Sequence, residues 1–204
     1  MATEVKNISE IIENSLENAF TYDGFKAKVQ EVVAQGKSTG HKPDDEALAN
    51  YSKLTYTRIK RLDKTLKIDD HIVEKVKAIS KPTTWIVLTE SWCGDAGQTI
   101  PVINKLAELN PNIELKLLLR DDNDALMSEF LTNGGKSIPK LIAYDSASKN
   151  VIDTWGPRPS EATKLVNDYK EAHGKLTPEF KQDLQVWYNK DKGKNTAEDL
   201  VKLL

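Results

Sequence analysis

Apolar residues recur every three or four positions along most of the first 80 residues, which is the spacing of one face of an α-helix. The pattern predicts two short helices between residue 8 and about residue 36, and a long helix of about six turns from Pro43 to Leu66. A further helix with Ile72, Val73 and Val76 inward leads to Lys81-Pro82. The inward positions expected on the three longer patterns are Ile8, Ile11, Ile12, Leu16 and Phe20, then Phe25, Val29, Val32 and Val33, then Leu48, Tyr51, Leu54, Ile59, Leu62 and Leu66.

After Lys81-Pro82 the pattern alternates between runs typical of buried strands and runs typical of helices. Strands are predicted at 85–89, 113–119, 141–144 and 151–155, the last two separated by a turn-rich segment short enough for a hairpin. Helices are predicted after the first strand, after the second and after the fourth. Their expected inward residues include Leu126, Phe130 and Leu131 on the second, and Ala162, Leu165, Val166 and Tyr169 on the third. The order β-α-β-α-β-β-α indicates an α/β fold whose first two strands are parallel.

The C-terminal residues return to a helical pattern. A helix carrying Phe180, Leu184 and Trp187 is followed by a loop at 190–195 and a short helix that ends at Leu204. Segments this short cannot bury enough surface to fold alone. We therefore expect an N-terminal helical extension at 1–80 and a C-terminal helical tail at 175–204, both packed on a central domain at 81–174. They would cover one side of it or pair two chains, so the oligomeric state stays open.

Composition limits the classes of function. The net charge is −2 and the isoelectric point is near 6.0, which gives no basic excess for binding nucleic acid. The sequence contains neither a signal-peptide core nor an apolar run long enough to span a bilayer, so the cytoplasm is expected. A single cysteine cannot form an internal disulfide, in agreement with a reducing compartment. One cysteine and three scattered histidines offer no metal-ligand spacing, and no metal is expected.

That one cysteine, Cys93, lies where the strand at 85–89 gives way to a helix. The first turn of a helix presents unpaired N–H groups and a partial positive charge, and both favour a thiolate over a thiol. Cys93 is therefore a candidate nucleophile.

The segment Trp92-Cys93-Gly94-Asp95-Ala96 with Pro101 resembles the active-site segment of the thioredoxin family, in which a strand ends in Trp-Cys-Gly-Pro-Cys and a proline follows five residues later. A second segment, Ser137-Ile138-Pro139-Lys140-Leu141-Ile142, is similar to the strand of that family that opens with a cis-proline. The resemblance covers roughly residues 81–172. It implies a thioredoxin-like sheet, with Cys93 opposite a cis peptide at Ile138-Pro139.

The same resemblance implies a substrate groove beside the cysteine, lined by Trp92, Gly94, Asp95, Ile138, Pro139 and Gly156. An extended partner would add to the residue before the cis-proline like an extra strand. Alternatives from the residues alone are a trans proline at the start of an edge strand and a Trp155 that is simply core. Arg158, in the loop after the last strand, is an anion-binding candidate or an ordinary surface arginine.

The chain departs from the family pattern at two positions. Ala96 replaces the second cysteine, so a disulfide on Cys93 would need an external resolving thiol such as glutathione, as in the single-cysteine branch of the related glutaredoxins. Val87 stands where many thioredoxins keep a buried aspartate. Glu90 or Asp95 could replace that acid, although plain surface positions are expected for both. Asp95 favours the helix and repels a thiolate, which leaves the direction of the Cys93 pKa shift open.

The long helix carries six basic side chains: Lys53, Arg58, Lys60, Arg61, Lys64 and Lys67. Such runs usually form a solvated face, and that is the expected arrangement here. The alternative is that Arg58 or Arg61 reaches the turn at Cys93 and binds an anion there.

These observations give a leading hypothesis and two rivals. The leading one is single-cysteine thiol–disulfide exchange by Cys93 with a protein or small-molecule thiol or disulfide. The first rival is a redox-inactive module that binds a peptide or protein in the groove beside Pro139. The second is a thiol sensor that joins two chains through Cys93.

Overall fold

The structure, a computed structural model, describes residues 7–203. Its centre is a four-stranded sheet in the order β2-β1-β3-β4, formed by β1 (Thr83–Thr89), β2 (Ile113–Leu119), β3 (Lys140–Asp145) and β4 (Asn150–Trp155). β1 and β2 are parallel, whereas β3 is antiparallel to both β1 and β4. The fold is the predicted thioredoxin-like α/β sheet with helical extensions. Every residue of β1 is buried, as expected for a strand at the centre of a covered sheet.

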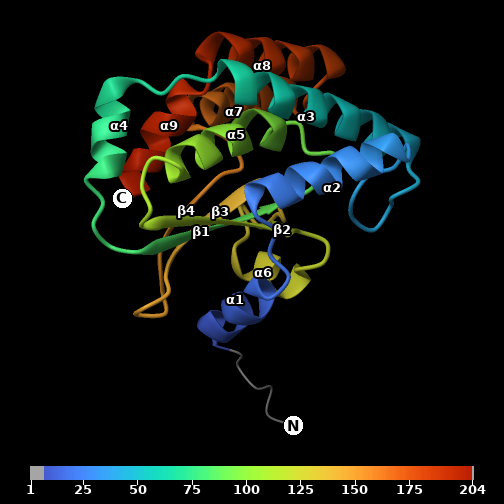
Figure 1. The fold of residues 1–204 in the computed structure, drawn as a ribbon. Coiled ribbons are helices and arrows are strands. Elements are labelled where there is room, and N and C mark those ends of the chain that lie inside the picture. The colour runs from blue at the N-terminus through green and yellow to red at the C-terminus, as the bar shows by residue number, and fades with distance from the viewer. Residues whose placement is uncertain (1–6, 204) are drawn as a thin grey trace.

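Helices cover both faces of the sheet (Figure 1). On one face lie α1 (Ile8–Leu16) and α6 (Asp124–Glu129). The other face carries α5 (Ala96–Ala107) directly on the sheet, with α2 (Tyr22–Ala34), α3 (Glu46–Thr65) and α4 (Asp70–Lys77) from the N-terminal part of the chain. The C-terminal helices α7 (Ser160–His173), α8 (Pro178–Asp191) and α9 (Lys194–Leu200) complete that layer, and a 3₁₀ turn (Val201–Leu203) follows.

The N-terminal and C-terminal additions share the core of the sheet. One cluster of buried apolar side chains joins Ile12 of α1 and Phe25 of α2 to Trp85 of β1, Ile103 of α5 and Leu200 of α9. A second, smaller cluster lies between α7 and α8. No helix within residues 7–203 combines the length and the apolar character that crossing a bilayer requires.

The inward face of α3 differs from the predicted one. Tyr51 and Leu54 are about half exposed, and the buried positions are Ala49, Ser52, Thr55, Ile59 and Leu62. The reason is the close approach of α3 to α5, because a Cβ on Gly97 would lie 3.1 Å from the Cα of Thr55. Only small side chains fit between backbones that close, so the size of the residues, rather than their apolarity, selects the face.

Four smaller expectations also fail. Ile8, predicted to face inward, is 40% exposed at the first position of α1. Phe20 was expected to share a helix face with α1, but its backbone instead pairs with Leu117 of β2. Leu165 is exposed because α8 covers a neighbouring face of α7, where Tyr169 stacks on Phe180 with the ring centres 4.0 Å apart. Leu131 is exposed because α6 ends at Glu129, so Leu131 lies in the following loop and not on the buried face of that helix.

Candidate functional site

The turn that carries Cys93 joins a buried strand to a buried helix. β1 ends at Thr89, and α5 begins at Ala96 with Asp95 as its N-cap residue. Thr55 of α3 supports the turn by donating its hydroxyl proton to the carbonyl oxygen of Cys93 at 3.2 Å. The sequence-predicted position of the cysteine, at the junction of strand and helix, is therefore the one that the structure has.

The Cys93 side chain faces the segment at Ile138-Pro139. Its Sγ donates to the carbonyl oxygen of Ile138 at 3.3 Å, and the backbone N–H of Ala96 donates to Sγ at 3.4 Å. The Ile138–Pro139 peptide is cis. Only 6% of the Cys93 surface is exposed, so the sulfur is enclosed rather than presented to solvent.

Burial sets the ionisation of Cys93. Burial, which deprives a thiolate of its hydration, and the nearby charge of Asp95 together raise the pKa of the thiol to about 12. The N–H groups at the start of α5 oppose this shift but do not outweigh it. Cys93 is therefore protonated at neutral pH in this arrangement. The direction of its pKa shift, which the sequence left open, is upward.

Asp95 is buried beside the cysteine, which contradicts its expected surface position. One carboxylate oxygen is 2.7 Å from the guanidinium of Arg158, and the other accepts the Tyr188 hydroxyl proton at 3.0 Å. Burial raises the Asp95 pKa, whereas Arg158 and Tyr188 favour the charged form. With a guanidinium so close, we assign Asp95 as the ionised partner of a charge-assisted pair. Arg158 thus binds an internal anion, the Asp95 carboxylate.

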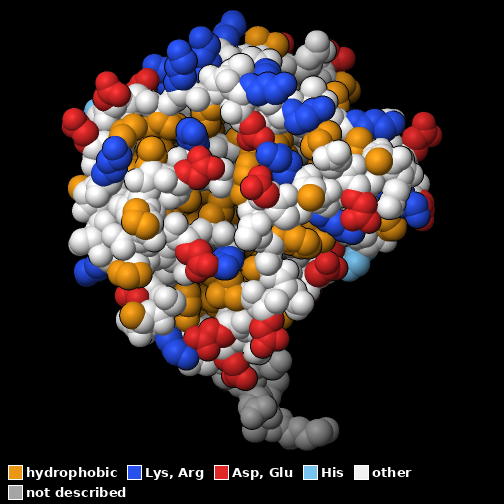
Figure 2. Space-filling model, viewed as in Figure 1, with side chains coloured by type: hydrophobic (Ala, Val, Ile, Leu, Met, Phe, Trp, Pro, Cys, Tyr) orange, Lys and Arg blue, Asp and Glu red, His pale blue; other side chains and the backbone are white. Residues whose placement is uncertain are grey.

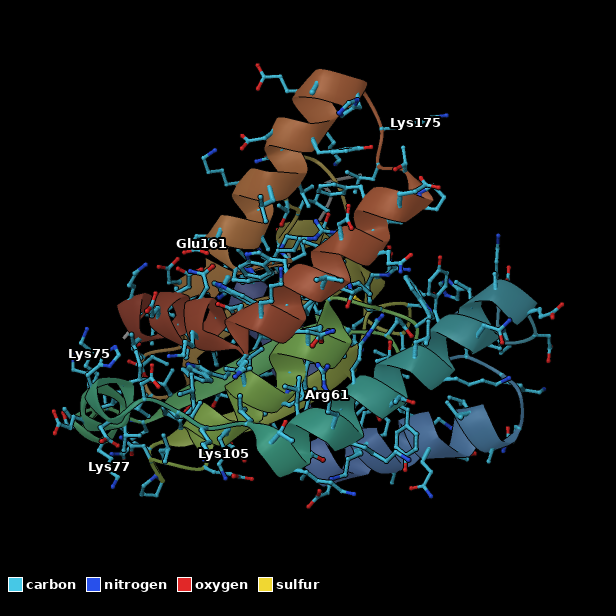
Figure 3. The ribbon with its side chains drawn as sticks, turned by 90° about the horizontal axis from the view of Figure 1, so that it is seen from above. Arg61, Lys75, Lys77, Lys105, Glu161 and Lys175 are labelled. Carbon is cyan, nitrogen blue, oxygen red and sulfur yellow. The ribbon has the colours of Figure 1, made fainter. Side chains whose placement is uncertain are left out.

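Of the two arginines of α3, Arg58 is half-buried and reaches the turn, so the solvated-face prediction is wrong for it, whereas Arg61 is exposed as predicted. Nη1 of Arg58 is 3.5 Å from the Gly94 carbonyl oxygen, and burial lowers the Arg58 pKa. Arg61 donates to Gln98 of α5 at 3.0 Å, at the place where α3, α5 and α8 meet (Figure 3). The four lysines of the run are exposed as predicted, and charges of both signs are interspersed on the face drawn in Figure 2.

Gly94 lies beneath side chains from both additions. A Cβ on Gly94 would lie 3.1 Å from Nη1 of Arg58 and 3.8 Å from Nε2 of Gln185, a residue of α8. Gln185 is itself fixed, because its side chain accepts a hydrogen bond from Gln98 at 3.0 Å. The additions therefore cover the turn that the resemblance presents as a substrate-binding surface.

Gly156 closes the site from the fourth strand. It has φ of +112°, and a Cβ there would overlap the carbonyl oxygen of Pro139. A glycine is needed on both grounds, since side chains are disfavoured at this φ and the space is taken. The structure thus brings Gly156 against Pro139, as the resemblance implies.

Comparison with known proteins agrees with this arrangement. A family model described as thioredoxin matches residues 41–170, which is more than half of the chain. The chain belongs to the thioredoxin family.

Two solved structures share the fold of this thioredoxin-family chain. One is a Pseudomonas aeruginosa protein of unknown function, PA1234, with 16% identity and a TM-score of 0.58 over 100% of this chain and 97% of that one. The other is an HIV epitope-scaffold, with 16% identity and a TM-score of 0.59 over 94% and 95% of the two chains. No curated protein matches the chain. At this identity the likeness extends to the fold alone.

A second buried acid, Glu90, comes two residues before Trp92 in the chain. Glu90 is fully buried, contrary to its expected surface position, and accepts hydrogen bonds from the Asp121 backbone at 2.9 Å and from the Thr39 hydroxyl. Burial raises its pKa. Trp92 is half-buried, with the Arg120 guanidinium 5.0 Å from its ring centre.

Sequence reasoning missed the residues that hold Glu90. Thr39 lies in the loop between α2 and α3, far from the cysteine in sequence, and Asp121 follows β2. The one local signal is Gly40, whose φ of +87° and contact with the Asp121 carboxylate exclude a side chain. Within residues 7–203, no group of three or more His, Cys, Asp or Glu side chains is arranged to hold a metal ion.

Proposed function

We propose that this thioredoxin-family protein carries out single-cysteine thiol–disulfide exchange through Cys93, with an external thiol such as glutathione as the resolving partner. The observation that supports the proposal is the position of Sγ, which lies at the amino end of α5 and against the carbonyl group that precedes Pro139. The Ala96 N–H that donates to Sγ would also stabilise a thiolate formed there.

The proposed exchange has two steps. The Cys93 thiolate attacks one sulfur of a disulfide, so that a mixed disulfide forms on Cys93 and the other half leaves as a thiolate. Because Ala96 offers no second thiol, an external thiolate then attacks the mixed disulfide. That step forms a new disulfide between the external thiol and the bound group, and it returns Cys93 as a thiolate. The net reaction exchanges one thiol for another and needs no further oxidant.

The first step requires a change around Cys93. The sulfur must leave the Ile138 carbonyl, lose its proton and meet the partner, yet it is buried and its pKa is about 12. Arg58 of α3 and Gln185 of α8 cover the adjoining Gly94. We infer that exchange depends on displacing these side chains, and that the closed form reacts far more slowly than a free cysteine.

Intact-mass measurement after incubation with oxidised glutathione tests the proposal. Wild type is expected to gain one glutathione, slowly at pH 7 and faster at pH 9, and to lose it when reduced glutathione is added. Cys93→Ser is the control and should gain none. Absence of the adduct from wild type at both pH values would overturn the exchange proposal.

The burial of Cys93 specifically favours a second candidate, a redox-inactive module that binds a peptide or protein beside Pro139. In that case Cys93→Ser would keep partner binding, and Ile138→Asp, which places a charge at a position only 8% exposed beside the groove, would lose it. A disulfide-linked dimer on a non-reducing gel, absent from Cys93→Ser, would instead point to the thiol sensor.

A further inference from the structure

An open cavity of about 490 Å³ is lined by Gly156 and by Lys140, the residue after Pro139. Five parts of the chain form its walls: the loop after α6, the start of β3, the end of β4, the start of α7 and the end of α9. Cys93 is not among the lining residues. This volume is in the range of pockets that hold small molecules.

Lys140 contributes a buried ammonium group to this cavity. The residue is only 7% exposed, and its Nζ donates to the Thr132 hydroxyl at 3.5 Å. No carboxylate of residues 7–203 lies within 4.0 Å of that nitrogen. Burial lowers the Lys140 pKa, and the more distant charge of Asp153 only partly opposes this. A buried ammonium without a counter-ion is costly, so it points to an anion that is bound from outside.

Two further donors in the cavity walls have no acceptor. The indole Nε1 of Trp155 and the guanidinium Nε of Arg158 are both buried, and neither makes a hydrogen bond within residues 7–203. Buried N–H groups are satisfied in most proteins, so each exception calls for an explanation. Seven buried side-chain atoms of residues 7–203 lack a hydrogen-bond partner, and two of them, on Trp155 and Arg158, belong to residues that line the same cavity as Lys140.

The other charges at the cavity are already paired. Arg158 binds Asp95 through its outer nitrogen. The Asp199 carboxylate accepts hydrogen bonds from the Ser160 backbone at 2.6 Å and from the Ser160 hydroxyl at 2.9 Å, and it pairs with Lys202 at 3.1 Å. Lys140 is therefore the cation that remains for a ligand, and the helix end at Ser160 is already occupied by Asp199.

We propose that this cavity binds a small organic carboxylate such as malonate, with one carboxylate group on Lys140 and the carbon chain beside Leu131 and Trp155. The Trp155 and Arg158 side chains line the cavity, and their unpartnered N–H groups would donate to the ligand once these side chains turn toward it. The site works without Cys93, so it is separate from the exchange reaction proposed above.

Titration with malonate, followed by ¹⁵N NMR of the tryptophan side chains, tests the proposal. The Trp155 indole signal, assigned with Trp155→Phe, is expected to shift and saturate. Sodium chloride at equal ionic strength should not reproduce the shift, and the same curve is expected in Cys93→Ser. Saturation by inorganic phosphate alone would overturn the choice of a carboxylate, and an equal response to chloride would overturn the site.

A matched pair of lysine variants tests the role of Lys140. Lys140→Met keeps an unbranched side chain that is one atom shorter and removes the charge, and it should weaken malonate binding at least tenfold. Lys105→Met makes the same change at the exposed end of α5, outside the cavity, and should leave binding unchanged. Equal affinity in the two variants would refute the proposal.

A measurement on wild type keeps the test valid if Lys140→Met folds poorly. With ¹³C-labelled lysine, saturating malonate is expected to raise the pKa of Lys140, because a bound anion favours its charged form. The signals of Lys105 and the other exposed lysines should not move. A Lys140 pKa that is unchanged at saturation would show that the carboxylate lies elsewhere.

Discussion

The turn at Cys93 and the cavity at Lys140 adjoin the same short segment, Ile138–Lys140, but they differ in how their polar groups are paired. At the turn, Asp95 has both Arg158 and Tyr188 as partners, and Cys93 has a partner in the Ile138 carbonyl group. At the cavity, the Lys140 ammonium has no carboxylate partner and two N–H groups have no acceptor within residues 7–203, and there is room for a ligand. The turn is complete within the chain, whereas the cavity is not.

This difference shows what the helical additions do to a thioredoxin-like site. α3 and α8 bring Arg58, Gln185 and Tyr188 to the turn, where they occupy the surface over Gly94 and Asp95. α9 brings Asp199 to the cavity, but the Asp199 carboxylate already accepts a hydrogen bond from Ser160 and forms an ion pair with Lys202. The additions therefore close the position where the family resemblance places chemistry, and they leave a donor-rich space beside it.

The largest expected difference in stability is between two variants, one that removes a charge at the turn and one that removes a charge at the cavity. Asp95→Ala leaves Arg158 without its counter-ion and Tyr188 without its acceptor. The free energy of unfolding should fall by about 3 kcal/mol, at the lower end of the range for a broken buried pair, because the Arg158 side chain is partly exposed to solvent. Lys140→Met removes an unpaired buried charge and should leave stability unchanged or raise it by up to about 1 kcal/mol. Urea denaturation at pH 7 measures both. Equal losses would show that the two places are paired alike.

The next effect concerns Gly156, the residue that both places share. Gly156→Ala forces a side chain into positive φ and into the Pro139 carbonyl oxygen, so a loss of at least about 2 kcal/mol is expected. Gly36 provides a control, because it has φ of +69° and nothing within 4 Å of its Cβ position. Gly36→Ala should lower the free energy of unfolding by about 1 kcal/mol, because it adds the strain of positive φ without any steric overlap. If thermal or urea unfolding gave the same loss for both variants, the close approach at Pro139 would have no energetic role.

Much of the fold was predictable because it depends on local patterns. The runs around Trp85 and Leu117 are apolar and flanked by turn residues, and the four strands and the order of the helices followed from them. The inward face of α3 was not predictable in this way. It is chosen by Gly97 on a different helix, and a pattern within one segment carries no information about the size of its neighbour.

The candidate site divides in the same manner. The junction at Cys93 and the facing Ile138-Pro139 segment followed from motifs close in sequence, as did the position of Gly156. The partners of Asp95 did not, because Tyr188 is 93 positions away and reaches the carboxylate only through the packing of α8. Burial of Glu90 and Asp95 was missed for a related reason. A carboxylate is expected at the surface unless its distant partners are known.

The smallest effect is the pH dependence of stability that Cys93 imposes on the closed turn. Its folded pKa of about 12 exceeds the value of about 8.5 for an unfolded cysteine. Between these values the folded state holds a proton that the unfolded state has lost, so stability falls as the pH rises. From pH 7 to pH 9.5 the loss is about 1.4 kcal/mol. Cys93→Ser lacks this titration, and other groups affect both proteins alike. Urea denaturation of wild type and Cys93→Ser at both pH values therefore isolates the contribution of the thiol. If the difference in unfolding free energy between the two proteins were the same at pH 7 and pH 9.5, the thiol would not be enclosed as the structure has it.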